Sequence, residues 1–140
     1  MISYLLTVRQ SIRIFLVILY VCCIAAISLL PPQDLPQVPL FPGADKMIHF
    51  LMYFILSVLF CWALRTEKHY HRVIFIILAT IGWGMFMEFI QLVMRAGRSF
   101  SWYDIFANSL GVFVGILIYV ATVMESQSRK NNIIKKPPKA

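Results

Sequence analysis

Four long apolar runs limit how this chain can fold. They cover residues 12–30, 47–64, 73–94 and 105–124. A helix needs about 20 mostly apolar residues to cross the hydrocarbon core of a bilayer, and each run is close to that length. The mean hydropathy is +0.77 and only 14% of residues are charged, which is too apolar for a soluble domain. The sequence therefore predicts an all-α protein, an integral membrane bundle of four transmembrane helices, and it shows no strand pattern.

Lys and Arg residues are distributed unevenly around these runs. Of the 13, only Lys46, Arg95 and Arg98 belong to the loops at 31–46 and 95–104. The others lie before or at the start of the first run, between the second and the third, or after the fourth. By the positive-inside rule both termini are predicted to be cytoplasmic, N-in/C-in, with the two loops outward. The net charge of +7 thus indicates membrane topology, and we expect no nucleic-acid partner.

The two ends of the chain differ from its centre. Residues 1–124 are predicted to form the transmembrane domain, and residues 125–140 a basic, disordered cytoplasmic tail, because that segment is polar and contains proline. Residues 1–30 also fit a cleaved signal peptide, since this segment is basic, then apolar, and ends in small residues. Cleavage would leave three spans with the same outer loops.

Polar residues recur on one face of the third span. Glu88, Gln91 and Arg95 are spaced i, i+3, i+7, so they share a narrow side of an otherwise apolar helix. This face lies in the outer half of the predicted span.

The fourth span has the same design. Asp104, Asn108, Gly111 and Gly115 share a face. The two glycines have the small-xxx-small spacing that lets helix backbones approach closely, although glycines that are merely tolerated by lipid fit the pattern equally well.

The second span opens with a third polar face. Lys46, His49, Tyr53 and Ser57 recur on one side, and Asp45 precedes them. Asp45 is also a candidate helix cap, because its carboxylate can accept a first-turn N–H and suits the positive end of the helix dipole.

All three polar faces begin at the outward side of the membrane. An ionised group that faces lipid costs at least about 2.5 kcal/mol, so we expect the faces to turn toward one another around a polar pocket. The predicted binding residues are Asp45, Lys46, His49, Tyr53, Glu88, Gln91, Arg98, Asp104 and Asn108.

Two stretches resemble a known family. "DKMIHFLMYFIL" at 45–56 and "EFIQLVMRAGRSFSWYDIFANSLGVFVG" at 88–115 are similar to the VanZ-like family of small bacterial membrane proteins, named for an accessory teicoplanin (glycopeptide) resistance protein. The residues that match its pattern are Asp45, Lys46, His49, Glu88, Gln91, Arg98, Asp104, Asn108 and Gly111. The resemblance implies the four-span layout, a bacterial cytoplasmic membrane and a link to cell-envelope processes or antibiotic resistance. It implies no mechanism.

Three functions fit the polar residues. The pocket would bind an envelope amphiphile, a lipid-linked precursor or a glycopeptide, with Lys46 and Arg98 meeting a phosphate or carboxylate. Alternatively, His49 and Glu88 are the catalytic candidates of an enzyme acting on a phosphoester. Finally, the polar groups would only pair internally and hold the helices together. A transport function fits poorly, because the polar faces end halfway through the membrane.

The sequence predicts neither a metal nor a cofactor. The possible ligands, His49, Glu88, Asp45 and Asp104, are scattered along the chain. The three cysteines, Cys22, Cys23 and Cys61, lie in apolar runs without a second ligand at metal-binding spacing, so neither a zinc site nor a disulfide is expected. Membrane lipids are the expected partners, and the sequence does not specify an oligomeric state.

Overall fold

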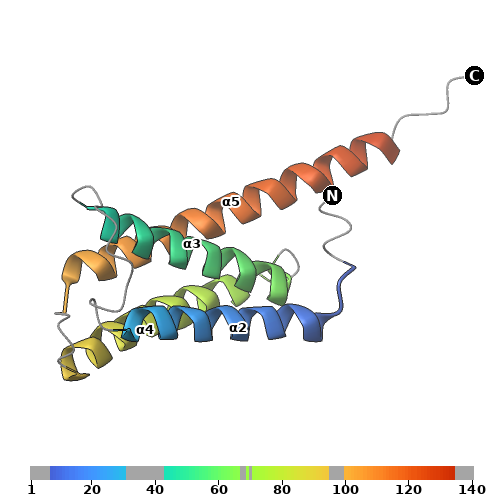
Figure 1. Ribbon diagram of the computed structural model, residues 1–140. Helices are drawn as coiled ribbons and strands as arrows, with labels where there is room; N and C mark the ends of the chain where they lie inside the picture. The colour runs from blue at the N-terminus through green and yellow to red at the C-terminus, as the bar shows by residue number, and fades with distance from the viewer. Residues whose placement is uncertain (1–6, 31–42, 67–68, 70, 95–99, 135–140) are drawn as a thin grey trace, which may run out of the picture.

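The computed structural model describes residues 7–30, 43–66, 69, 71–94 and 100–134 (Figure 1). All the regular structure in these residues is helical, with α2 Gln10–Leu29, α3 Ala44–Leu64, α4 His71–Met94 and α5 Trp102–Ile134. Each helix contains a segment that is long and apolar enough to cross a membrane, which in α5 is Trp102–Ser126. The predicted all-α fold with four such helices is confirmed. The N-in/C-in orientation stays a prediction.

Local chemistry sets several helix ends. Leu30 is extended (φ −62°, ψ 133°), as expected for the residue that precedes Pro31, and α2 ends there. Gly43, in a left-handed conformation (φ 89°), precedes α3. Asp45 therefore lies inside the first turn, and no side chain caps this helix, so the capping role considered for Asp45 was wrong. Ser101 precedes α5, and its hydroxyl accepts the N–H of Asp104 at 3.3 Å.

The last helix continues beyond the predicted span. Residues 125–134, which the sequence analysis assigns to a disordered tail, are helical, so that prediction was wrong for this segment. The segment contains Glu, Gln, Arg and Lys, which favour helix, and the first proline after it is Pro137. Extending an existing helix also avoids the cost of nucleation. In Figure 1, α5 extends past the ends of the other helices.

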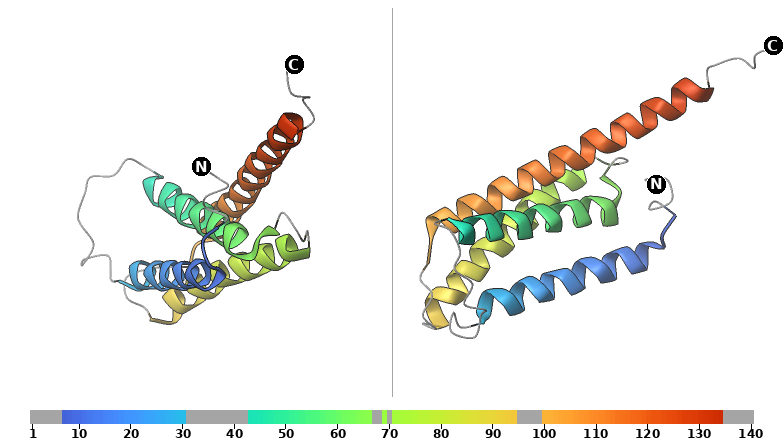
Figure 2. Two further views of the ribbon diagram at one scale, coloured as in Figure 1. Left: turned by 90° about the vertical axis from the view of Figure 1, so that its right-hand side faces the viewer. Right: turned by 45° about the horizontal axis from the view of Figure 1, so that its top comes forward.

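Helix α3 is the central element, because its contacts with the other three helices are together more extensive than those of any other helix. It runs parallel to α5 and is closest to it (Figure 2). Gly111 and Gly115 make this approach possible. A Cβ atom at Gly111 would clash with the carbonyl oxygen of Phe50, and one at Gly115 would lie 2.6 Å from that of Phe54. The predicted close-packing role of both glycines is confirmed.

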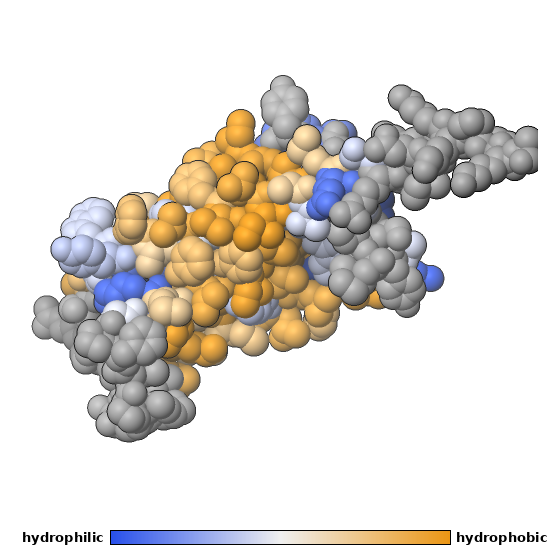
Figure 3. All heavy atoms as spheres, turned by 90° about the horizontal axis from the view of Figure 1, so that it is seen from above, coloured by the Kyte–Doolittle hydropathy of each residue, from blue (hydrophilic) through white to orange (hydrophobic). Residues whose placement is uncertain are grey.

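Large apolar side chains cover the outside of the bundle. Phe15, Leu78, Phe89 and Leu117 are each more than half exposed. Figure 3 shows a broad hydrophobic band between more hydrophilic ends. The core between the helices holds Ile24, Tyr53, Leu56, Cys61, Ile76, Val112 and Ile116. An apolar exterior of this width suits lipid.

Two arginines contribute to the end of the bundle opposite Gly43. Arg13 is 1% exposed, and its Nη1 donates to the carbonyl oxygen of Trp62 at 2.7 Å. Arg72 donates to the carbonyl oxygen of Leu64. The last carbonyl groups of a helix lack partners within it, so these arginines satisfy the end of α3. Sequence analysis treated both only as topology signals.

The glycine contact predicts a selective loss of stability. Gly115→Leu would force α3 and α5 apart and lower the free energy of unfolding by about 1–3 kcal/mol, as overpacking does. The measurement is unfolding in detergent micelles. Gly82→Leu is the matched control, because nothing lies within 4 Å of a Cβ at Gly82. Equal stability of the two variants would contradict the close α3–α5 contact.

Candidate functional site

Polar side chains from all four helices gather at one end of the bundle. Consecutive helices are antiparallel, so the C-terminal ends of α2 and α4 lie beside the N-terminal ends of α3 and α5 (Figure 2). Six of the polar residues there are buried: Ser28, His49, Glu88, Gln91, Asp104 and Asn108. Asp45, Glu88 and Asp104 are three of the six acidic residues in the chain. The described residues of the three predicted polar faces thus meet, as expected for groups that avoid lipid, whereas Arg95 lies outside the part of the chain that the structure describes.

An ion-pair group forms the outer part of this site. The Nζ atom of Lys46 pairs with the carboxylate of Asp45 and lies 3.1 Å from Oδ1 of Asp104. The side chains of Lys46 and Asp45 are 41% and 57% exposed, whereas that of Asp104 is 12% exposed. The group therefore leads from the surface of the bundle to its interior.

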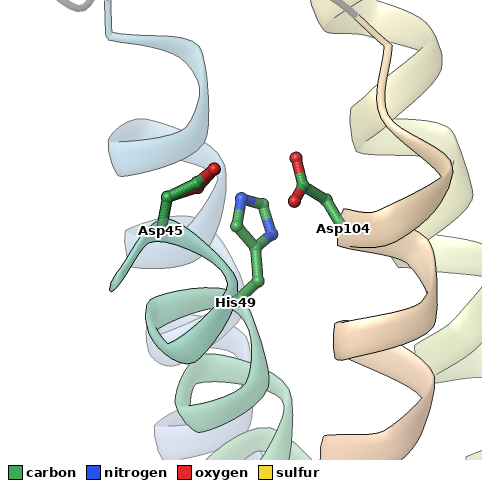
Figure 4. A group of neighbouring side chains, drawn as sticks. All are labelled: Asp45, His49 and Asp104. Carbon is green, nitrogen blue, oxygen red and sulfur yellow. The ribbon is translucent and has the colours of Figure 1, made fainter. Parts of the chain in front are cut away.

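His49 lies deeper and is held by a side chain of α5. Its Nδ1 is 3.1 Å from Oδ1 of Asn108. An amide oxygen only accepts, so in this contact Nδ1 carries a hydrogen, and in the neutral imidazole Nε2 is then the nitrogen with the free lone pair. Figure 4 shows the ring of His49 between the carboxylates of Asp45 and Asp104.

Three side chains that the sequence separates come together here. Asp45, His49 and Asp104 each offer one metal-ligand atom, and these atoms lie within 4.8 Å of one another. Our reason for expecting no metal, that the ligands are scattered, was therefore wrong for these three residues. Glu88, the fourth residue considered, does not belong to this group.

Glu88 holds the start of α5. Its carboxylate is 1% exposed and accepts the backbone N–H of Ser101 at 3.1 Å. Ser101 in turn caps the helix that carries Asp104. Glu88 and His49 thus bond to different groups, and the proposed acid–base pair is not seen as a direct hydrogen bond.

Gln91 and Tyr53 contribute to packing around the site. The Nε2 of Gln91 donates to the carbonyl oxygen of Ser28 at 2.8 Å, which ties α4 to the last turn of α2. Tyr53 is buried at Gly84, where a Cβ atom would lie 3.2 Å from its ring and from Nδ2 of Asn108. These contacts hold α3, α4 and α5 together beneath the ion-pair group.

The sequence patterns did not identify three residues of the site, Ser28, Gly84 and Ser101. The spacing of Ser101 and Asp104 is a helix-start signal that could have identified the cap. Gly84 precedes Glu88 by one turn on the same helix face, which is a weaker signal. Ser28 contributes its backbone carbonyl, for which the side-chain pattern gives no signal. Arg98 lies outside the described residues, so its predicted place in the site stays a prediction.

Comparison with known proteins supports a family relationship. A sequence model of the VanZ/LLP1 family matches residues 4–124. An uncharacterized protein of the fission yeast Schizosaccharomyces pombe is 28% identical over 112 residues, which are 80% of this chain and 64% of that protein. The chain thus spans less than two thirds of this relative's length. No solved structure matches the chain significantly. Because the relative is fungal, this similarity does not place the chain in a bacterial membrane.

The Glu88–Ser101 bond predicts different effects for two substitutions. Glu88→Ala would leave the N–H of Ser101 without its acceptor and lower the free energy of unfolding by about 1–3 kcal/mol. Glu88→Gln would keep an accepting oxygen and lose less. Unfolding in detergent micelles, with helicity followed by circular dichroism, measures both. If the two variants lost equal stability, the hydrogen bond would not be the reason for the effect.

Proposed function

Because the chain belongs to the VanZ/LLP1 family, we propose that it is a membrane-embedded receptor for the polar headgroup of an envelope amphiphile. The ligand class is a lipid-linked precursor or a glycopeptide. The headgroup enters the site between α3 and α5, and the apolar part lies along the lipid-facing side of the bundle. The proposal places the site on the extracytoplasmic side of a bacterial cytoplasmic membrane and links the protein to cell-envelope processes, including antibiotic resistance.

The observation that carries this proposal is the composition of the outer ion-pair group. Gln91 and Glu88 bond to backbone groups and brace the bundle. Asp45, Lys46 and Asp104 instead bond mainly to one another, between two helices whose packing the glycines already secure. Ion pairs add little stability compared with apolar packing, whether they are partly exposed like Lys46–Asp45 or largely buried at one partner like Lys46–Asp104. A purely structural role therefore explains the hydrogen bonds of Gln91 and Glu88 better than it explains the charges of the ion-pair group.

The surroundings of the group suit an amphiphile. Trp102 and Tyr103 begin α5 beside Asp104 and are 71% and 77% exposed. Aromatic side chains at this level of a membrane protein commonly lie at the lipid–water interface. Carboxylates bind hydroxyl and amino groups, while the ammonium of Lys46 can meet a phosphate or carboxylate. A headgroup that carries sugar or amino-acid groups provides both kinds of partner.

The receptor proposal predicts a loss of binding at two positions. The probes are a polyprenyl-diphosphate disaccharide and a glycopeptide, each titrated against protein in lipid nanodiscs. We expect His49→Ala and Asp104→Asn to weaken binding at least tenfold, about 1.4 kcal/mol, because both remove contacts inside the site. Glu125→Gln is the control, since Glu125 is exposed and lies toward the other end of the long helix α5.

The outcomes of this experiment distinguish the three functions. Folded variants that bind both probes as tightly as the wild type would support a purely structural role. Variants that still bind, but lose a probe hydrolysis that the wild type performs, would support the catalytic alternative with His49. Weaker probe binding by the two variants, together with no hydrolysis of either probe by the wild type, would support the receptor.

The proposed orientation has its own test. We replace Cys22, Cys23 and Cys61 with alanine and introduce a single cysteine between residues 36 and 42. An impermeant maleimide should label this cysteine in intact cells, because the loop is predicted to face outward. A cysteine between 67 and 70 is the control that should react only after permeabilisation. The reverse pattern would overturn the extracytoplasmic site.

A further inference from the structure

We infer that Asp45, His49 and Asp104 form a binding site for a divalent transition-metal ion, of the class of Zn²⁺ or Mn²⁺. The inference goes beyond the proposed receptor function and does not depend on it. Asp45 and His49 lie one turn apart on α3, and Asp104 comes from α5. Their ligand atoms are already within 4.8 Å of one another. Metal–ligand bonds of about 2.1 Å require separations of about 3.0–3.4 Å, so metal binding requires small rotations of the two carboxylates toward the ion.

The imidazole of His49 is oriented as a metal ligand. Nδ1 faces the amide oxygen of Asn108 at 3.1 Å, so Nε2 is the ring nitrogen that the neutral imidazole can offer to an ion. Histidines that bind metals commonly donate their other N–H to a fixed acceptor, which sets the tautomer and the ring direction. Asn108 is 3% exposed and borders Gly84, so this acceptor is itself held in place.

Asp104 provides an independent observation. The residue is 8% exposed, and its Oδ1 accepts no hydrogen bond from any residue that the structure describes. Its compensation in the structure is the charge of Lys46, 3.1 Å away. A buried carboxylate oxygen that is compensated only by a nearby cation is a position where a metal ion can replace that cation.

The charges and donor atoms select the class of ion. Two carboxylates and a neutral imidazole sum to −2, so a divalent cation neutralises the group, whereas Lys46 compensates only one charge. One nitrogen and two oxygen donors suit Zn²⁺ or Mn²⁺ better than Mg²⁺ or Ca²⁺, which prefer oxygen alone. Three protein ligands also leave at least one coordination position for water or an oxygen ligand.

The position of Lys46 leads to a specific prediction about metal affinity. Because its ammonium group lies between the same carboxylates, it competes with the metal. Removing it should strengthen metal binding, while removing a ligand should abolish it. The ammonium can move out to solvent when the ion binds, since the side chain is already 41% exposed.

The test measures Zn²⁺ binding to the purified full-length protein in detergent, after treatment with a chelator, by calorimetry. Mn²⁺ binding is followed by electron paramagnetic resonance. We expect one ion per chain. His49→Ala, His49→Gln and Asp104→Asn should each lower the affinity at least tenfold, Asn108→Leu about 10–100-fold, and Lys46→Gln should raise it. His71→Ala is the matched control, because that exposed histidine begins α4 at the opposite end.

Circular dichroism and the unfolding midpoint identify the variants that retain the fold. In His49→Gln and Asp104→Asn the new side chain is close in size to the one it replaces. We therefore expect these two variants to fold, so that their metal affinity can be compared with that of the wild type. Wild-type protein that binds neither ion would overturn the inference. So would binding that persists in both folded ligand variants, or binding that is lost in His71→Ala instead.

Discussion

The close approach of α3 and α5 is the contact on which the rest of the structure depends. It exists because Gly111 and Gly115 present no side chain to the backbone at Phe50 and Phe54. Asp104 and Asn108 precede Gly111 by about two turns and one turn on the same face of α5. Once the glycines fix the register of the two parallel helices, these polar residues lie beside Asp45 and His49. The site is thus a consequence of how two apolar helices pack, and bulk at either glycine would separate its two halves.

Polar groups in this bundle fall into two kinds according to what they bond. Arg13, Arg72, Gln91 and Glu88 each bond to a backbone group at a helix end, where the helix itself offers no partner. In lipid these backbone groups have no water to bond, so the four side chains supply the hydrogen bonds that water would otherwise make. The ion-pair group and the His49–Asn108 pair bond side chain to side chain, across α3 and α5. That difference distinguishes the residues that stabilise the fold from the residues to which we assign a function.

The sequence was sufficient to predict the four helices and the three polar faces, because hydropathy and a period of 3.6 residues are local properties. It could not specify which polar group bonds to which. The rotation of each helix about its axis, and the depth at which it lies beside its neighbours, arise from packing. The pairing of His49 with Asn108 and of Glu88 with Ser101 depends on both. The same limit explains the wrong statement about metal ligands, since Asp45 and Asp104 are distant in the chain but adjacent in the fold. The helical segment 125–134 was missed for another reason, because polarity was given more weight than helix propensity.

The site combines a cation of the protein with a cluster of acidic ligands, and this combination has a consequence for binding. With Lys46 in place, Asp45 and Asp104 are partly neutralised, and the group can remain intact at the edge of the membrane without any ligand. A divalent ion must displace that ammonium, so its net affinity is the difference between two electrostatic interactions and is lower than the ligands alone would give. Displacement also moves a positive charge from the interior of the group toward the surface, since the side chain of Lys46 is 41% exposed. An anionic headgroup at the interface would then meet both the freed ammonium and the open coordination position of the metal. The same ion would occupy the carboxylates of Asp45 and Asp104, so the headgroup would gain the freed ammonium but lose these carboxylates as partners for its hydroxyl and amino groups.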